Sequence, residues 1–259
     1  MYKALNIYKP MGTTPYQIVK KLKEERTEYA ESTISYAGRL DPMAEGVLIL
    51  LIDKENKKRE EYQSLDKEYK FKVLFGLETD TYDLLGMVKN EPRTSENAQV
   101  SINKELVKDY IKNLVGKRKQ KYPPFSSYRI DGKPLFQWAK EGKINEIKIP
   151  EKEIIIFESH FLKSYKLEAE KLRNLAISCI SKVEGKFRQK EIIKRWKNYF
   201  RKSRVEEFPV MQFKITCSSG TYIRGIANNL GKLTSTGALS LHIKRTRVGK
   251  YKIKNAQKL

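Results

Sequence analysis

The sequence predicts an α+β fold. Segments with the two-residue alternation of half-buried strands recur along the chain, and segments with the apolar spacing of amphipathic helices lie among them. Several predicted strands are hairpin-like neighbours, and the regular strand, helix, strand rhythm of a parallel doubly wound sheet is missing. The 259 residues are enough to bury a substantial core without disulfides or metals, and we expect one folded unit with insertions.

The N-terminal part is predicted to form a strand followed by a helix. The strand is expected over residues 4–8. In TTPYQIVKKLKEE, Thr14 is suited to cap the helix, Pro15 to occupy its first position and Gln17 to complete a capping box. The buried stripe of this helix is predicted to consist of Ile18, Val19 and Leu22.

Two further strands are expected before residue 80. The run VLILLI, residues 47–52, is uninterrupted and apolar, which is typical of a buried strand. The segment EYKFKVLFG alternates between apolar and charged residues. The row predicted to face the core consists of Tyr69, Phe71, Val73 and Phe75.

The centre of the chain is predicted to contain two loops and a helix. TSENAQVSIN is polar and predicts a loop, and KELVKDYIKNLVG predicts an amphipathic helix that ends at Gly116. KRKQKYPPFSSYRIDGKP is basic and aromatic and is interrupted by two prolines, which predicts an irregular, exposed loop. The apolar side of the helix is predicted to carry Leu106, Tyr110, Ile111 and Leu114.

The last third is predicted to contain strands at EIIIFES, NLAISCI and VMQFKITC. Between the last two lies VEGKFRQKEIIKRWKNYFRKSR, in which nine Lys or Arg residues are opposed by two Glu. Apolar residues recur there at helical spacing, which predicts a basic amphipathic helix inserted between neighbouring strands. These apolar residues are Phe187, Ile192, Trp196 and Phe200.

The charge of the chain points to a polyanionic partner. Lys and Arg total 53 against 31 Asp and Glu, and the formal net charge of +22 exceeds what solubility requires. Nucleic acid or an anionic membrane would suit this charge. The longest apolar run, residues 47–52, is far shorter than the roughly 20 residues that span a bilayer. The 15 tyrosines favour RNA, because unpaired bases stack on aromatic rings.

The residues suited to metals, disulfides and common catalytic sets are scarce. Cys179 and Cys217 are too few and too distant for a disulfide framework or a zinc site, and His160 and His242 stand alone. The sequence contains no Walker loop and no Ser/His/Asp order. The start, MYKALNIYKP, is unlike a signal peptide. We therefore expect a cytoplasmic protein without metal or cofactor, whose chemistry would use a carboxylate, a hydroxyl or a base.

One carboxylate lies in a restrictive setting, in AGRLDPMAEGVLILL. Pro42 biases the backbone of Asp41 toward an extended conformation, while Gly38 and Gly46 allow tight turns on either side. An aspartate that forms a turn is the ordinary structural explanation for such a pattern.

Two other charged groups could take part in chemistry. LETDTYDLLG offers Glu78, Asp80 and Asp83, which could bind Mg²⁺ in a nuclease; the alternative is a polar loop closed by Gly86. TCSSGTYIRGIANNLGK predicts a strand that turns into a helix, with Arg224 in the first helical turn, where the dipole disfavours a cation. An anion, such as a carboxylate or an RNA phosphate, could resolve that conflict, and an ordinary exposed arginine is the alternative.

Several motifs together resemble the TruB family of pseudouridine synthases. YAGRLDPMAEGVLIL is similar to the aspartate motif of pseudouridine synthases, although GRLD by itself also has close variants in the RsuA and RluA families. The further matches follow in the family's order and extend over about residues 5–251. They are NIYKPMGTT, DKEYKFKVLFGLETDTYDLLG, PPFSSYRIDGK, and CSSGTYIRGIANNLG followed by GALSLHIKRTRVGKY.

The resemblance implies a fold, an activity and a catalytic set. The implied fold is a central mixed, mainly antiparallel sheet flanked by helices and loops, in one catalytic domain over residues 1–259. The implied activity is isomerisation of uridine 55 in the T-loop of tRNA to pseudouridine, with base flipping and without cofactor or metal. Asp41 would attack the flipped nucleotide at the base or at the sugar. Arg224 would pair with Asp41, and Tyr69 would stack on the target base and help proton transfer.

The resemblance also implies a set of substrate-binding residues. They are Lys9, Pro10, Tyr36, Gly38, Arg39, Lys121, Tyr122, Arg129, Tyr222 and Ile243. Lys9 and Pro10 match a Lys-Pro pair that supports the aspartate loop, and simple core and turn roles would explain them equally well. Residues 117–143 correspond to a thumb-like RNA-binding loop, whose cations suit phosphates and whose rings suit stacking.

The chain departs from the family pattern at two places. The family commonly has His five residues before the catalytic Asp, where it takes part in displacing the T-loop base, and this chain has Tyr36. Beyond RTRVGKYKIKNAQKL we expect no C-terminal PUA RNA-binding domain of the kind that many members carry. The basic helical insertion, residues 182–204, could then restore RNA affinity; a merely solvated helix is the alternative.

The expected partner is therefore the T-arm of tRNA, bound by a monomer that does not associate with membranes. The main alternative is a non-catalytic RNA-binding or tRNA-folding protein with the same fold. The charge and Tyr36 favour that alternative, whereas the intact set of Asp41, Tyr69 and Arg224 opposes it. A Mg²⁺ nuclease that uses the acidic group is a more distant alternative.

Overall fold

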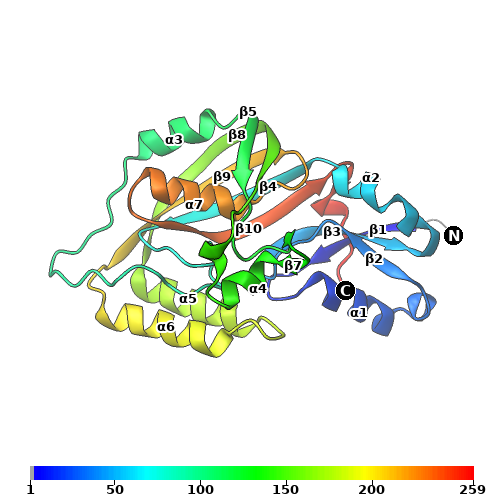
Figure 1. Cartoon of the computed structure of the whole chain (residues 1–259), viewed down its shortest axis with the longest axis horizontal. Helices are drawn as coiled ribbons and strands as arrows, with labels where there is room; N and C mark the ends of the chain where they lie inside the picture. The colour runs from blue at the N-terminus through cyan, green and yellow to red at the C-terminus, as the bar shows by residue number, and fades with distance from the viewer. Residues whose placement is uncertain (1–2) are drawn as a thin grey trace.

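A mixed sheet forms the centre of the molecule (Figure 1). The computed structural model describes residues 3–259. The strands of the sheet in this range are β1 (Lys3–Lys9), β2 (Ile34–Ala37), β3 (Ala44–Ile52), β4 (Lys67–Phe75), β5 (Gly116–Lys121), β8 (Glu151–Glu168), β9 (Glu207–Cys217), β10 (Ala238–Val248) and β11 (Tyr251–Lys252). A separate ribbon consists of β6 (Arg129–Ile130) and β7 (Lys133–Pro134).

The strand order explains which segments meet at the centre. The order is β1-β3-β10-β4-β9-β8-β5, with β2 beside β3 and β11 beside β10. Strand β10 runs parallel to β3, and the other pairings of the sheet within residues 3–259 are antiparallel. The mixed, mainly antiparallel α+β fold expected from the sequence is thereby confirmed.

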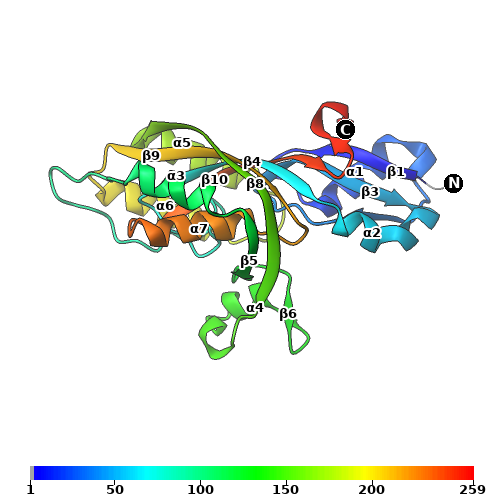
Figure 2. The ribbon, with the colours of Figure 1, turned by 90° about the horizontal axis from the view of Figure 1, so that it is seen from above.

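Helices lie against the sheet and at its edges. They are α1 (Pro15–Glu25), α2 (Arg59–Ser64), α3 (Lys104–Lys112), α4 (Leu135–Lys140), α5 (Ala169–Ser181), α6 (Gln189–Lys202) and α7 (Ile223–Leu233), with 3-10 turns at Thr27–Tyr29, Asp53–Lys58, Ile144–Glu146 and Ile253–Asn255. Figure 2 shows the segment with α4 and β6 projecting from the sheet on the side where α7 lies. No helix in the described part of the chain combines the length and the apolar character needed to cross a membrane.

The start of α1 has the predicted capping box. The Thr14 hydroxyl accepts a hydrogen bond from the Gln17 backbone N–H at 3.2 Å, and the Gln17 side chain accepts one from the Thr14 N–H at 2.6 Å. Pro15 occupies the first turn, where its missing N–H has no cost. Ile18 and Leu22 are buried, so the predicted stripe faces the core.

The prediction of a strand at NLAISCI is wrong, because these residues belong to α5. Leu172, Ala176 and Ile180 are buried at four-residue spacing, whereas Asn174 and Ser178 are exposed. A short apolar run fits the helical and the strand period equally, and here the helical period applies. The basic insertion, residues 182–204, therefore contains α6, which together with α5 forms a helical hairpin that connects β8 to β9.

The prediction of an irregular loop from residue 117 onward is wrong in its first part. Residues 116–121 form β5, which pairs with β8 at the edge of the sheet. This edge strand is mostly exposed and rich in cations, with Gln120 as its buried residue, so it lacks the apolar alternation that predicts a strand.

Helix α3 also differs from its prediction. Val107 and Ile111 are buried, whereas Leu106 is 40% exposed and does not belong to the apolar face. The helix ends at Lys112, before Gly116, which instead begins β5 with a φ of +106°. That backbone conformation is one that glycine adopts without strain.

Helix α6 is fixed to the core by aromatic side chains. Ile192, Trp196 and Tyr199 are buried, and the Trp196 ring lies 6.0 Å from that of Phe200. The Trp196 indole N–H donates to the Gly86 carbonyl at 3.0 Å, so α6 is tied to the loop that follows β4. The basic amphipathic helix expected from the sequence is therefore present and has a well-packed inner side.

We predict that Trp196→Ala lowers the free energy of unfolding by about 3–5 kcal/mol, because it removes a fully buried ring. Lys197→Ala, at the adjacent exposed position, should change it by less than about 0.5 kcal/mol. Urea unfolding followed by circular dichroism measures both. Equal stability of the two variants would contradict the packing of α6.

Candidate active site

Asp41 lies in a tight turn between β2 and β3. The Ala44 N–H donates to the Asp41 carbonyl at 3.0 Å, and the Gly12 N–H donates to the Pro42 carbonyl at 2.8 Å. Gly38 has a φ of +79°, which permits the turn that leads from β2 to the aspartate. The Asp41 side chain is 38% exposed, so the turn presents it to solvent.

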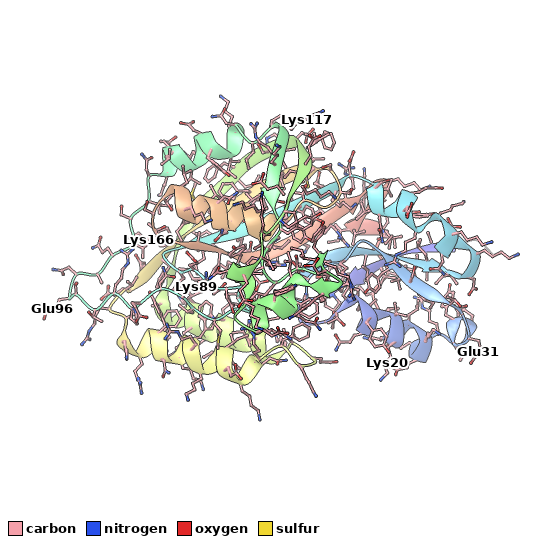
Figure 3. All side chains as sticks on the ribbon, in the orientation of Figure 1. Lys20, Glu31, Lys89, Glu96, Lys117 and Lys166 are labelled. Atoms are coloured by element: carbon pink, nitrogen blue, oxygen red, sulfur yellow. The ribbon has the colours of Figure 1, made fainter. Side chains whose placement is uncertain are left out.

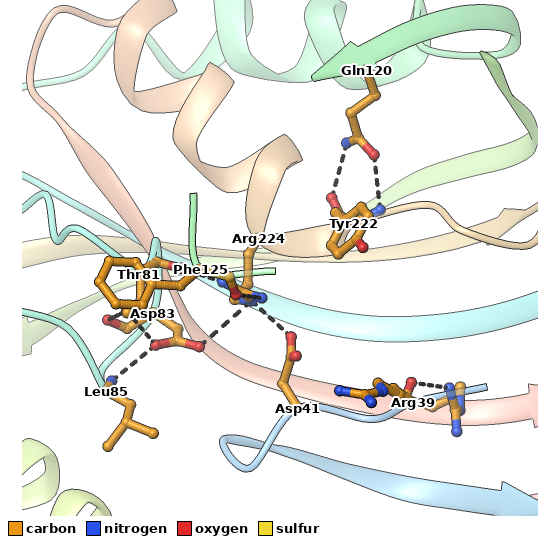
Figure 4. A network of polar contacts seen from close by, with 10 residues as sticks. Arg39, Asp41, Thr81, Asp83, Leu85, Gln120, Phe125, Tyr222 and Arg224 are labelled. Carbon is orange, nitrogen blue, oxygen red and sulfur yellow. Dashed lines mark hydrogen bonds and ion pairs between the residues drawn. The ribbon is translucent and has the colours of Figure 1, made fainter. Parts of the chain in front are cut away.

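Arg224 binds the Asp41 carboxylate from the first turn of α7 (Figure 4). Its Nε donates to Asp41 Oδ2 at 2.7 Å, while its two terminal nitrogens donate to the Thr81 carbonyl at 2.5 Å and the Phe125 carbonyl at 3.4 Å. The side chain is only 4% exposed. Burial would lower the pKa of Arg224, but Asp41 and Asp83 raise it above its ordinary value. The cation at a helix start is thus compensated by carboxylates.

Asp83 is a second carboxylate beside the same arginine. Its Oδ2 lies 3.6 Å from Arg224 Nε, and its Oδ1 accepts hydrogen bonds from the Thr81 hydroxyl at 2.7 Å and the Leu85 N–H at 2.9 Å. Burial raises the pKa of Asp83 to about 6, although Arg224 acts in the opposite direction. Asp83 and Asp41 therefore both lie at Nε of the arginine, with Asp41 the nearer of the two.

The other two residues of the acidic group have separate partners. Glu78 pairs with Lys89 at 3.3 Å, and Asp80 pairs with Arg188 at 2.9 Å. Within residues 3–259 no three His, Cys, Asp or Glu side chains gather in an arrangement that could bind a metal ion. The acidic group thus contributes to structure at several points instead of forming one cluster.

A cavity of about 670 Å³ opens beside Asp41. Eight of the residues predicted from the sequence line it: Tyr36, Gly38, Arg39, Asp41, Tyr69, Tyr222, Arg224 and Ile243. Tyr69 is 8% exposed and pairs in the sheet with Ile215 and Arg245. Burial raises the pKa of the Tyr69 phenol, and Arg245 partly opposes the shift. The cavity therefore combines a carboxylate with neutral aromatic rings.

Lys9 and Pro10 lie outside this cavity. Lys9 is fully buried, and its ammonium donates to the Pro10 carbonyl at 2.9 Å and the Thr13 carbonyl at 2.7 Å. The turn that it closes contains Gly12, whose N–H binds the Pro42 carbonyl. Lys9 thus shapes the segment that supports the aspartate turn.

The thumb-like residues lie at the rim of the site. The Tyr122 ring stacks on that of Tyr128 at 4.0 Å and approaches the edge of Tyr222 at 5.7 Å. Lys121 and Arg129 are exposed and do not line the large cavity. Tyr122 therefore adjoins the site through Tyr222, whereas the two cations face solvent.

Arg245 is a residue that sequence reasoning missed. It is 1% exposed, and its guanidinium donates to the carbonyls of Val47 at 2.8 Å, Arg39 at 3.0 Å and Gly38 at 3.4 Å. The signal was present in β10, where Leu241, Ile243 and Arg245 alternate on the buried row. An arginine in such a row needs several acceptors, and here β3 and the segment before Asp41 supply them.

Gln120 was also missed. Its side-chain carbonyl accepts from the Tyr222 N–H at 2.8 Å, and its amide donates to the Tyr222 carbonyl at 2.9 Å (Figure 4). These two bonds attach β5, at the base of the thumb, to the start of α7. The signal in the sequence was a glutamine among four cations of an exposed strand.

Solved structures show the class of fold. The chain matches one chain of a Cbf5–Nop10–Gar1 complex with a TM-score of 0.58 at 17% identity. The match covers 99% of this chain and 52% of the matched chain. It matches an H/ACA ribonucleoprotein bound to a substrate RNA with a TM-score of 0.54 at 16% identity, over 98% of this chain and 50% of that one. The chain spans about half the length of these structures. These structures therefore share the fold of this chain.

The sequence comparison shows the family to which the chain belongs. The family described as TruB family pseudouridylate synthase (N terminal domain) matches residues 26–183, so the chain belongs to the TruB family. Relatives called tRNA pseudouridine synthase B include that of Thermosipho melanesiensis, 29% identical over 97% of this chain and 66% of its own length. The relative from Flavobacterium johnsoniae is 28% identical over 97% of this chain and 90% of its own length.

Lys9 is expected to make stability depend on pH. Burial lowers the pKa of Lys9 from 10.5 to about 7, and Asp41 partly opposes the shift. Between pH 7 and pH 10.5 the Lys9 side chain binds a proton in the unfolded chain more readily than in the folded protein. The contribution of Lys9 to the free energy of unfolding therefore rises with pH in this window and decreases as the pH falls toward 7.

We predict that Lys9→Met reduces the slope of the unfolding free energy against pH in this window, by up to about 1.4 kcal/mol per pH unit. Urea unfolding of both proteins at a series of pH values measures the slopes. Parallel pH profiles for variant and wild type would show that Lys9 stays charged in the folded protein.

Proposed function

We propose that this protein isomerises uridine to pseudouridine in tRNA, at position 55 of the T-loop, with Asp41 as the reactive carboxylate. The observation that carries the proposal is the half-exposed Asp41 carboxylate, bound on one side by buried Arg224 and open to a large cavity on the other. The names of the relatives support tRNA as the substrate. The basic composition of the chain suits a polyanionic substrate in the cytoplasm.

The cavity is suited to a nucleotide that has left its stack. Its volume of about 670 Å³ accommodates a base with its sugar, and Tyr69, Tyr222 and Ile243 offer rings and an apolar side chain to the base. Extrusion of the nucleotide costs a few kcal/mol of stacking, which contacts with the cavity and the thumb would offset. Tyr122 and Tyr128 provide a stacked pair of rings beside Tyr222, which lines the cavity.

The chemistry needs a nucleophile and a proton carrier but no net reagent. The bond between N1 and C1′ of the nucleotide breaks, a bond between C5 and C1′ forms, C5 loses a proton and N1 gains one. Arg224 engages Oδ2 of Asp41, and Oδ1 accepts no hydrogen bond within residues 3–259, so Oδ1 is the oxygen that attacks. It attacks either the base or the sugar. Tyr69, which remains protonated, assists the proton transfer.

Tyr36 takes the place of the histidine that is common in the family. It lies in β2 and lines the large cavity as well as a second cavity of about 340 Å³, which Asp41 also lines. We infer that its ring stacks on the base that is displaced when the target nucleotide flips. An aromatic ring suffices for that contact, so the substitution is compatible with catalysis.

A non-catalytic tRNA-binding protein with this fold is the second candidate, favoured by the exposed cations of β5 and of the thumb. Both candidates bind tRNA, and product formation distinguishes them. The experiment incubates the protein, which we expect to be a monomer, with unmodified tRNA in EDTA and maps pseudouridine along the RNA.

We predict pseudouridine at position 55 with the wild type and a rate at least about 10³-fold lower with Asp41→Ala, because the nucleophile is lost. Binding of tRNA by Asp41→Ala should be retained, and this serves as the control for folding. Binding without product in the wild type would support the second candidate. Cleavage of the RNA after Mg²⁺ is restored would indicate a nuclease.

A further inference from the structure

The α5–α6 hairpin is built into the wall of the candidate site. Phe187 and Arg188, just before α6, line the second cavity, which also contains Asp41, Tyr36 and Phe125. The Arg188 guanidinium lies 4.5 Å from the centre of the Phe125 ring and pairs with Asp80 at 2.9 Å. One end of the hairpin therefore contacts the thumb segment and the loop that follows β4.

The hairpin is also fixed along its length. Beyond the buried Trp196, Arg195 donates to the Val88 carbonyl at 2.9 Å and lies 3.4 Å from Glu91. Arg195 is thus engaged within the protein, although it belongs to the most basic part of the sequence. A surface carried by α6 would consequently keep a fixed position relative to Asp41.

The outward side of α6 carries a stripe of cations. Lys190, Lys194, Lys197 and Arg201 follow one another at intervals of four, three and four residues, so they share one face of the helix. All four are exposed, and none forms an ion pair with another residue in the described range. At the rise of an α-helix the stripe is about 16 Å long. Figure 3 shows long side chains extending from the outer side of α6 into solvent.

We propose that this stripe, Lys190, Lys194, Lys197 and Arg201, binds the phosphate backbone of the RNA whose target nucleotide enters the cavity beside Asp41. The proposal rests on the proposed function for the identity of that RNA. Four unpaired cations in a row match a row of phosphates, and the cavity wall connects the stripe to the reacting carboxylate.

The chemistry of the stripe favours RNA over an acidic protein. A protein interface needs a buried apolar centre, with charges at its rim. The large apolar residues of α6 face inward, and none of the large exposed apolar side chains within residues 3–259 belongs to this helix. A surface of cations alone is typical of contacts with phosphates, which are electrostatic and independent of sequence.

The test is the quadruple variant K190Q/K194Q/K197Q/R201Q, since glutamine preserves helix propensity while it removes the charge. Binding of an unmodified tRNA transcript is titrated at several salt concentrations. Each of the four cations is expected to contact one phosphate of the tRNA, and the variant lacks all four. The slope of log K against log salt should therefore become less steep by about 3. Binding at low salt should weaken at least about tenfold. Circular dichroism confirms that α6 is intact.

A matched pair of doubles controls for net charge. K194Q/K197Q removes two charges from the stripe, and K104Q/K112Q removes two exposed, unpaired charges from α3. The stripe double should change the slope by about 1.5 and the α3 double should leave it unchanged. Equal slopes for the quadruple variant and the wild type, or equal effects of the two doubles, would overturn the proposal.

The readout separates this proposal from the proposed function. The binding slope is measured without turnover, so it reports on the stripe even if the wild type forms no pseudouridine. Conversely, the wild type could modify tRNA while the quadruple variant keeps the slope of the wild type. That result would refute RNA binding by the stripe and leave the proposed function in place.

Discussion

The ion pair between Asp41 and Arg224 is the constraint on which the rest of the site depends. A guanidinium that is only 4% exposed would be costly in isolation, and it is stable here because two carboxylates and two carbonyls surround it. These partners come from separate parts of the chain: the aspartate turn, the loop after β4 and the thumb segment. Because one buried cation binds all three parts, contacts that are far apart in the sequence define the position of the Asp41 carboxylate.

The sheet brings these parts together through one strand. Strand β10 pairs parallel with β3, which follows the aspartate turn, and antiparallel with β4, which carries Tyr69. From its buried row Arg245 binds the carbonyls of Gly38 and Arg39 and thereby orients the backbone before Asp41. Two buried arginines therefore fix Asp41: Arg224 binds its carboxylate, and Arg245 binds the backbone just before it.

Local sequence signals predicted local structure well and long-range structure poorly. The capping box of α1 and the alternation of β4 depend on adjacent residues, and both were predicted from them. Segment 174–180 fits both periods, and β5 is an exposed edge without alternation, so neither could be assigned from composition alone. The role of Arg245 depends on a contact 206 residues away along the chain, which only the strand register reveals. The family motifs predicted that Asp41 and Arg224 lie close together. The unfavourable helix dipole at Arg224 predicted an anionic partner but did not show which anion it is.

The most direct test of this account is the single-turnover rate of pseudouridine formation in Arg224→Lys. Lysine keeps the charge but cannot reach Asp41, Asp83 and two carbonyls at once, so the carboxylate should lose its orientation while tRNA affinity is retained. The rate should be at least about 100-fold lower than that of the wild type, with the Kd for tRNA within about threefold. A variant that modifies tRNA at the rate of the wild type would contradict the central role of this ion pair.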